Sequence, residues 1–124
     1  MTPFYPGLTP IDAYTAGGFR FAGMSHRGSI LVLPSGIHAW GPASLDDASP
    51  SDFALVFEDE GIDLLLIGTG AEMRRPPRAV RDTFAARNMA FDVMATAAAV
   101  STYNVLLDER RRVGAALIAV DAIP

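Results

Sequence analysis

The stretch FDVMATAAAVSTYNVLLDERRRVGAALI, residues Phe91–Ile118, predicts a strand, a helix and a second strand. Phe91–Ala95 and Val113–Val120 are short and mostly apolar, as buried strands are. Between them, apolar side chains recur every three or four residues along Thr96–Arg111, the spacing of one helix face: Ala99, Val100, Tyr103 and Leu107. This order predicts an α/β fold in which helices cover a parallel or mixed sheet.

The same alternation extends toward the amino terminus. Ile62–Ile67 is predicted to be a buried strand. Arg78–Asn88 is predicted to be a helix that starts beside Pro77 and packs Val80 and Phe84 inward. Strand and helix therefore alternate through the whole second half of the chain.

The first half is richer in predicted strands. Phe19–Leu33 is expected to form a hairpin that turns at Arg27-Gly28, and Ile37–Trp40 is expected to be a further short strand. A polar loop then leads through a serine-proline cap into a short helix over Ser51–Glu58.

The length of 124 residues suits one domain. We expect residues 1–16 to form an extended N-terminal lead-in and residues 17–124 to form a single α/β domain. The sequence contains no secretory leader and no apolar window of the roughly 20 residues that cross a bilayer. It therefore predicts a cytoplasmic protein that reaches a membrane only through a partner.

The composition excludes several classes of chemistry. All 10 basic residues are arginine and no cysteine occurs, so lysine Schiff bases, phosphate-loop lysines, thiolate nucleophiles and iron–sulfur ligands are absent. The 14 acidic residues give a net charge of −4, which disfavours a nucleic-acid partner.

No catalytic residue, metal site or cofactor is predicted. His26 and His38 have no carboxylates at metal-binding spacing, and no G-x-S-x-G nucleophile turn occurs. Trp40 has two interpretations: it anchors a protein partner, or it closes one end of the core.

A glycine turn follows the strand at Ile67. Gly68-Thr69-Gly70 matches part of a dinucleotide-binding fingerprint, but Met73 stands at the third glycine position and prolines displace the next helix. The sequence therefore argues against a dinucleotide site.

An anion site at the same place stays open as an alternative. The turn lies at the carboxyl end of a predicted strand, where α/β sheets often bind ligands. Arg74, Arg75 and Arg78 follow it near the amino end of the next helix, and arginine binds carboxylate and phosphate well. The other interpretation is a tight strand exit followed by solvated arginines.

Several segments in order resemble one protein family. These are ILVLPSGIHAW, Gly68-Thr69-Gly70, the Met94 and Thr96 step, Thr102-Tyr103-Asn104, and Glu109, Arg111 and Val113 before the last strand. The chain resembles, from about Gly17 onward, the domain-of-unknown-function family that includes the mitochondrial respiratory complex I assembly factor 3. Ala95 and Val100 depart from the acidic residue and the cysteine that members often carry there, so no role is transferred to these two positions.

The resemblance implies a three-layer α/β domain with a mixed central sheet, packed helices and an additional β-hairpin layer. It implies no established catalytic activity, and it implies a chaperone-like role in assembling a membrane respiratory complex. For a bacterial-type chain, the expected function is therefore a non-enzymatic module with a protein partner, with an anion-binding protein or enzyme as the alternative.

The Thr102-Tyr103-Asn104 segment also has a physical interpretation. Tyr103 follows Ala99 and Val100 on the inner helix face, so its hydroxyl should be buried and hydrogen-bonded. Asn104 is expected to bond a neighbouring loop, for which the Gly68–Gly70 exit is the candidate. The segment is then either a structural latch or a pair of ligand contacts.

Overall fold

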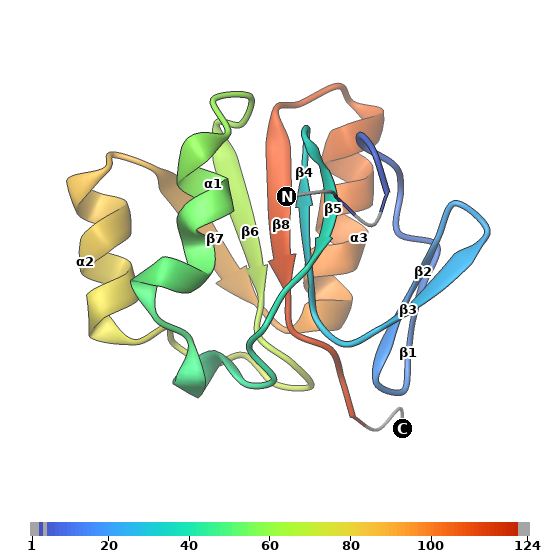
Figure 1. Cartoon of the computed structure of the whole chain (residues 1–124), viewed down its shortest axis with the longest axis horizontal. Helices are drawn as coiled ribbons and strands as arrows, with labels where there is room; N and C mark the ends of the chain where they lie inside the picture. The colour runs from blue at the N-terminus through green and yellow to red at the C-terminus, as the bar shows by residue number, and fades with distance from the viewer. Residues whose placement is uncertain (1–2, 4, 122–124) are drawn as a thin grey trace.

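The computed structural model describes residue 3 and residues 5–121 of the chain (Figure 1). Its helices and strands follow the predicted order in the second half. In chain order they are β1 (Ala13–Thr15), β2 (Gly18–Phe21), β3 (Met24–Arg27), β4 (Ile30–Leu33), β5 (Gly36–Ala39), the 3₁₀ helices η1 (Leu45–Asp47) and η2 (Pro50–Phe53), α1 (Ala54–Glu58), β6 (Leu64–Gly68), α2 (Arg78–Ala86), β7 (Ala90–Met94), α3 (Thr96–Asp108) and β8 (Val113–Leu117).

The central sheet has five strands in the order β5-β4-β8-β6-β7. β8, β6 and β7 run parallel, while β4 pairs antiparallel with both β8 and β5. This is the mixed sheet that was predicted. β4 and β8 are buried along their whole length, which explains why their sequences are continuous apolar runs instead of alternating ones.

The predicted hairpin is wrong in its extent. Its turn is at Ala22-Gly23, not at Arg27-Gly28, and it joins β2 to β3 in a separate three-stranded sheet, β1-β2-β3. Ala22 and Gly23 have φ values of 52° and 75°, the positive values that a two-residue hairpin turn of type I′ requires. At Gly28, with φ of 93°, the chain leaves this sheet for β4 in the central one.

The small sheet also uses residues from the expected N-terminal lead-in. Ala13–Thr15 pair with Arg20 through Gly18 of β2, and Ile11 is only 1% exposed. The proposed division of the chain at residue 16 stays a prediction, but this stretch contributes both a strand and a core side chain.

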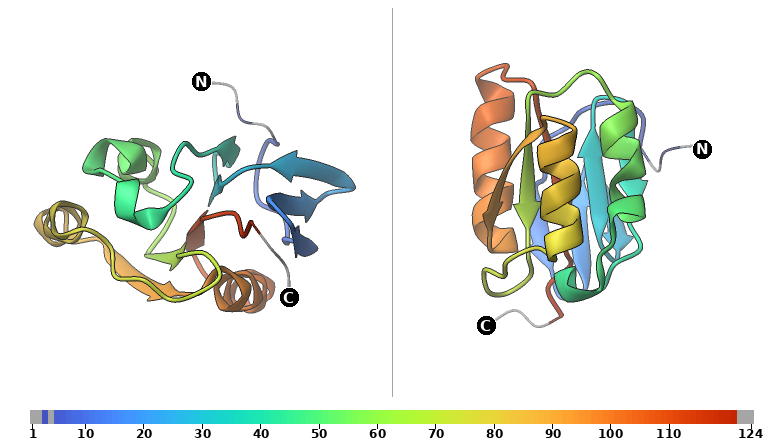
Figure 2. Two further views of the ribbon diagram at one scale, coloured as in Figure 1. Left: turned by 90° about the horizontal axis from the view of Figure 1, so that it is seen from below. Right: turned by 90° about the vertical axis from the view of Figure 1, so that its left-hand side faces the viewer.

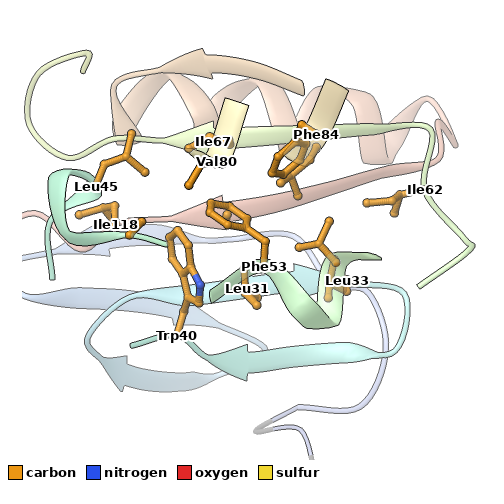
Figure 3. Packing of buried hydrophobic residues seen from close by; sticks show 14 residues of the cluster. Leu31, Leu33, Trp40, Leu45, Phe53, Ile62, Ile67, Val80, Phe84 and Ile118 are labelled. Atoms are coloured by element: carbon orange, nitrogen blue, oxygen red, sulfur yellow. The ribbon is translucent and has the colours of Figure 1, made fainter. Parts of the chain in front are cut away.

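Two apolar clusters form the core, one on each face of the central sheet. On one face, side chains from β4, β6 and β8 pack against α1, α2 and the 3₁₀ helices (Figure 3). On the other face, side chains from the same strands pack against α3 and the small sheet. Figure 2 shows the resulting three layers, with α1 and α2 on one side of the sheet and α3 and the small sheet on the other. The three-layer α/β prediction is confirmed.

The helix ends have local causes. The backbone N–H of Ser49 donates to Asp52 Oδ2 at 2.8 Å, and Pro50 occupies the first position of η2, so the predicted cap is present. α3 ends at Asp108, three residues before the predicted end, because Arg110 adopts a φ of 60° and the Arg111 N–H returns to the Leu106 carbonyl at 2.9 Å. Within the predicted polar loop, Leu45 of η1 is fully buried.

Candidate functional site

The carboxyl ends of β6, β7 and β8 meet at one edge of the sheet, and the glycine turn lies there. Gly68 is where α3 passes closest to β6: a Cβ on it would lie 3.0 Å from Thr96 Cα and 3.1 Å from Ala99 Cβ. Gly70 has a φ of 107°, which favours glycine. Both glycines therefore have structural causes, one of packing and one of backbone conformation.

Thr96, the first residue of α3, joins the turn to the last strand. Its hydroxyl accepts a hydrogen bond from the Gly70 N–H at 2.9 Å and donates one to the Ile118 carbonyl at 2.7 Å. Its own N–H donates to the Gly70 carbonyl at 2.9 Å, and the side chain is fully buried. In the sequence, Thr96 is part of the family pattern and the first residue of a predicted helix. A threonine at the start of a helix that follows a strand was the available signal for its role.

Thr69 closes the loop that follows the turn. Its hydroxyl donates to the Glu72 carbonyl at 2.6 Å and accepts from the Arg74 N–H at 3.0 Å. Because the residue is 3% exposed, the middle position of the glycine turn presents almost no surface to a ligand.

The three arginines after the turn do not converge. Arg74 pairs with Asp46 at 3.3 Å and Arg78 pairs with Asp82 at 3.6 Å, both at the exposed surface. Arg75 lies on another side of the connection between β6 and α2, where it lines a cavity together with Phe91 and Val93 of β7. The structure therefore separates the residues that the anion hypothesis groups together.

The strand end does carry an open depression of about 440 Å³. It is lined by Thr69, Gly70 and Arg74, but Glu72 and Asp121 also line it. Two carboxylates beside one arginine that already pairs with Asp46 make a poor anion site. The helix dipole of α2 adds nothing, because no α2 residue lines the depression.

Tyr103 and Asn104 form a latch, but not to the glycine turn. The Tyr103 hydroxyl donates to the Thr9 carbonyl at 2.9 Å. The Asn104 amide accepts from the Ile11 N–H at 2.9 Å and donates to the Ile11 carbonyl at 2.8 Å. Asn104 therefore holds the N-terminal segment on α3, and the expected bond to the Gly68–Gly70 exit is wrong. Thr102 is half-buried and takes no part in these bonds.

No local pattern in the chain indicates this partner, because the latch joins residues more than 90 positions apart. Burial raises the pKa of the Tyr103 hydroxyl, while the bond to Thr9 opposes this rise. Tyr103 is therefore a neutral donor at physiological pH.

Trp40 belongs to the core. It is 6% exposed, its ring meets Phe53 at a centroid distance of 5.3 Å, and its indole N–H donates to the Asp52 carbonyl at 2.7 Å (Figure 3). Of the two interpretations of Trp40, the structure supports closure of the core, because a buried and bonded indole has little surface to offer a partner.

The histidines are apart from this edge of the sheet. His38 is 4% exposed, and its Nε2 lies 3.1 Å from Ser35 Oγ. Burial lowers its pKa, and the nearby Asp59 opposes the shift. Within residue 3 and residues 5–121, no three histidine, cysteine or acidic side chains are grouped to hold a metal ion.

The helices are also too short or too polar to cross a bilayer in the part of the chain that the structure describes. The longest of these helices, α3, has 13 residues.

The chain is similar to several known proteins. It is 39% identical over 123 residues to an uncharacterized protein of Rhodobacter capsulatus, covering 98% of this chain and 94% of that one. It is 32% identical over 115 residues to the NADH dehydrogenase (ubiquinone) 1 alpha subcomplex assembly factor 3 of Mus musculus, covering 92% of this chain and 62% of that one. The chain thus spans about three fifths of the length of that assembly factor.

A solved structure has the same fold as this chain. The crystal structure of a protein described as an outer membrane protein from Bartonella henselae matches with a TM-score of 0.88 and 48% identity, over 94% of this chain and 98% of that one. The model of one protein family matches residues 11–118, and the resemblance drawn from the sequence is confirmed. The chain therefore belongs to the family described as protein of unknown function DUF498/DUF598.

Proposed function

We propose that this protein is a non-enzymatic interaction module that helps to assemble a membrane respiratory complex. The observation that carries the proposal is the 32% identity to a mouse complex I assembly factor across 92% of the chain. Because the match covers nearly the whole chain, the likeness is not confined to one motif.

The hydrogen bonds at the strand end and in the latch to the N-terminal segment support an interaction role over catalysis. The polar groups that attract attention in the sequence, those of Thr69, Thr96, Tyr103 and Asn104, are bonded within the chain. A catalytic group must reach a substrate, whereas these groups hold loops and the N-terminal segment in place.

The proposal includes a location. In a bacterial-type cell, the module acts on the cytoplasmic side and associates with the inner membrane through its protein partner. This follows by analogy with the assembly factors, whose names link them to a membrane enzyme.

The test is capture of the tagged full chain from the cell that encodes it, after mild crosslinking. We expect subunits of a respiratory complex, or another assembly factor for it, to be recovered together with the chain. Repeated recovery of the chain alone would contradict the proposal.

A second assay addresses the anion alternative directly. The purified chain is heated with inorganic phosphate, ATP and citrate, each at a concentration well above 1 mM. We expect no rise in Tm, because the three arginines do not converge on one site. Binding would be easy to detect, since a ligand at 100 times its Kd would add about 2.7 kcal/mol of stability. A rise that disappears in Arg74→Ala would revive the anion site.

A further inference from the structure

Half of the arginines lie in one short segment of the chain. Met73–Arg87 contains five of the 10 arginines and only one of the 14 acidic residues, Asp82. The chain as a whole has a net charge of −4. The connection into α2 and α2 itself therefore form a basic strip on an acidic protein.

Two arginines of this strip, Arg75 and Arg81, lie next to an open sheet edge, whereas Arg74 and Arg78 pair with Asp46 and Asp82. β7 is the last strand in the order β5-β4-β8-β6-β7 and pairs only with β6. Figure 2 shows β7 at the rim of the sheet, between the layers of α2 and α3. An edge strand leaves one row of backbone groups unpaired, and such a row can accept a further strand.

The hydrogen bonds show which backbone groups face outward. The Met94 carbonyl accepts from the Thr69 N–H at 2.9 Å, so Met94 directs its backbone toward the β6 side. Successive residues of a strand alternate, so Phe91 and Val93 direct theirs toward the open edge. The Val93 N–H is covered by the exposed carboxylate of its neighbour Asp92, at 2.9 Å. An incoming strand has to displace this carboxylate before it can pair with the Val93 N–H.

The side chains beside this edge combine apolar surface with positive charge. An open cavity of about 440 Å³ lies there, with two arginines and one acidic residue in its lining; it is lined by Met73, Arg75, Pro76, Arg81, Phe91, Asp92 and Val93. Met73 is 64% exposed, more than any other large hydrophobic side chain that the structure describes.

The two arginines at this cavity are available to a partner. Arg81 donates from Nε to the Pro76 carbonyl at 3.1 Å, which positions its guanidinium group without neutralising it. In the described part of the chain, no carboxylate lies within 4.0 Å of the Arg75 guanidinium, whereas Arg74 and Arg78 each have one.

We propose that the β7 edge, defined here as Phe91–Met94 of β7 with Met73, Arg75 and Arg81, binds an acidic, extended segment of a partner protein. The segment pairs as a sixth strand with β7, places apolar side chains on Met73, Phe91 and Val93, and directs carboxylates toward Arg75 and Arg81. Strand addition of this kind takes affinity from backbone bonds and specificity from alternate side chains. This inference rests on the proposed function and specifies the docking surface.

Electrostatic repulsion favours an acidic segment over a second copy of the chain as the partner of the β7 edge. Two β7 edges brought together would set the basic strips of both copies beside each other, and like charges across an interface oppose association. An acidic segment removes that repulsion.

The experiment uses the full chain, labelled with ¹⁵N, and two synthetic peptides of eight residues. Both peptides carry threonine at every second position, so that these side chains share one face of the strand. On the other face, one peptide alternates valine with glutamate and the other alternates valine with lysine. We expect the glutamate peptide to bind at least about tenfold more tightly, and to shift the amide signals of residues 91–94 more than those of β5 at the opposite edge.

Adjacent arginines provide a matched pair of variants. Arg75→Glu should weaken binding of the glutamate peptide at least about tenfold, because Arg75 lines the β7 edge. Arg74→Glu should change it less than about twofold, because Arg74 lies at the strand-end depression and pairs with Asp46. Val93→Pro removes the N–H that faces the open edge, where an incoming strand would replace Asp92, and it removes no bond to β6. The variant should therefore fold and lose the peptide.

Three results would overturn the proposal: no binding of the glutamate peptide, equal binding of both peptides, or signal shifts that map away from residues 91–94. Dimerisation through β7, seen by sedimentation together with shifts at these residues in the free chain, would assign the edge to a second copy instead. Failure of this proposal can be told apart from failure of the proposed function. If a partner captured from cells binds Arg75→Glu as tightly as it binds the unaltered chain, the docking surface is refuted but the assembly role is not.

Discussion

The strand end and the β7 edge of this protein differ in how their polar groups are used. At the strand end, the hydroxyls of Thr69 and Thr96 have protein partners at 2.6–3.0 Å. At the β7 edge, Arg75 has no carboxylate beside it and Met73 is mostly exposed, within the part of the chain that the structure describes. The first region carries the recognisable motif, and the second carries none.

A recognisable sequence motif therefore need not mark a functional surface. Glycines and hydroxyl side chains at the strand end are required by close packing and by buried backbone groups. Groups that remain unpaired at a surface are the ones that can gain from binding a partner. Substitutions in the two regions should therefore differ in how much stability they cost.

Gly68→Val should be the most damaging change. The added side chain has to enter the contact between β6 and α3, where even a Cβ would lie 3.0 Å from Thr96 Cα. Overpacking of this kind costs about 3 kcal/mol of unfolding free energy. Urea denaturation measures it. A loss below about 0.5 kcal/mol would mean that the glycine is retained for access to a ligand.

Thr96→Val should cost about 2 kcal/mol, because it keeps the shape of the side chain and leaves the Gly70 N–H and the Ile118 carbonyl without their partner. The same denaturation series measures the loss, and Thr96→Ser, which keeps the hydroxyl, is its control. If Thr96→Val were as stable as the unaltered chain, the hydroxyl would not be part of the fold's support.

Asn104→Ala should cost about 1.5 kcal/mol by removing both bonds to Ile11. Asn104→Asp keeps the acceptor for the Ile11 N–H and loses the donor, so it should be intermediate. Hydrogen exchange at Ile11 reports the latch directly, and unchanged exchange in Asn104→Ala would show that the latch is not what protects this amide.

The second half of the fold could be predicted from the sequence, but the hairpin in the first half could not. The apolar runs of β6, β7 and β8 and the periodicity of α2 and α3 were enough to predict the second half, because each depends on local spacing. The hairpin was misplaced because Ile30–Leu33 is as strand-like as its neighbours, and only pairing with β8 assigns it to the central sheet.

The candidate site was harder to predict than the fold. The spacing of Arg74 and Arg75 says that they are adjacent, but not that one lines the strand end and the other the β7 edge. Likewise, the partner of Asn104 is 93 positions away. Contacts of this kind depend on how the layers pack and leave no local pattern in the chain.

Acidification should lower stability through His38. Its folded-state pKa lies below the ordinary value of 6.5 because the ring is buried. Below about pH 6.5 the unfolded chain binds a proton that the folded chain does not, so unfolding free energy falls as the pH drops toward the folded-state pKa.

Urea denaturation at pH 7.5 and pH 5.5 measures this dependence, and His38→Gln should reduce it. Some dependence should remain, since burial also lowers the pKa of His26. An identical dependence in His38→Gln would show that His38 does not titrate in this range.

Arg75→Glu should have the smallest effect on stability, within about 0.5 kcal/mol, because the residue is exposed and has no ion pair within the described part of the chain. Thermal unfolding measures it. A large loss of stability would mean that Arg75 supports the fold and is not free to bind a partner.

The decisive measurement is the Kd of the partner protein recovered from cells for three chains: the unaltered chain, Arg75→Glu and Arg74→Glu. If the β7 edge is the recognition surface and the strand end is internal support, Arg75→Glu weakens binding at least about tenfold and Arg74→Glu by less than about twofold. The opposite ranking, or equal losses from both neighbours, would contradict the account.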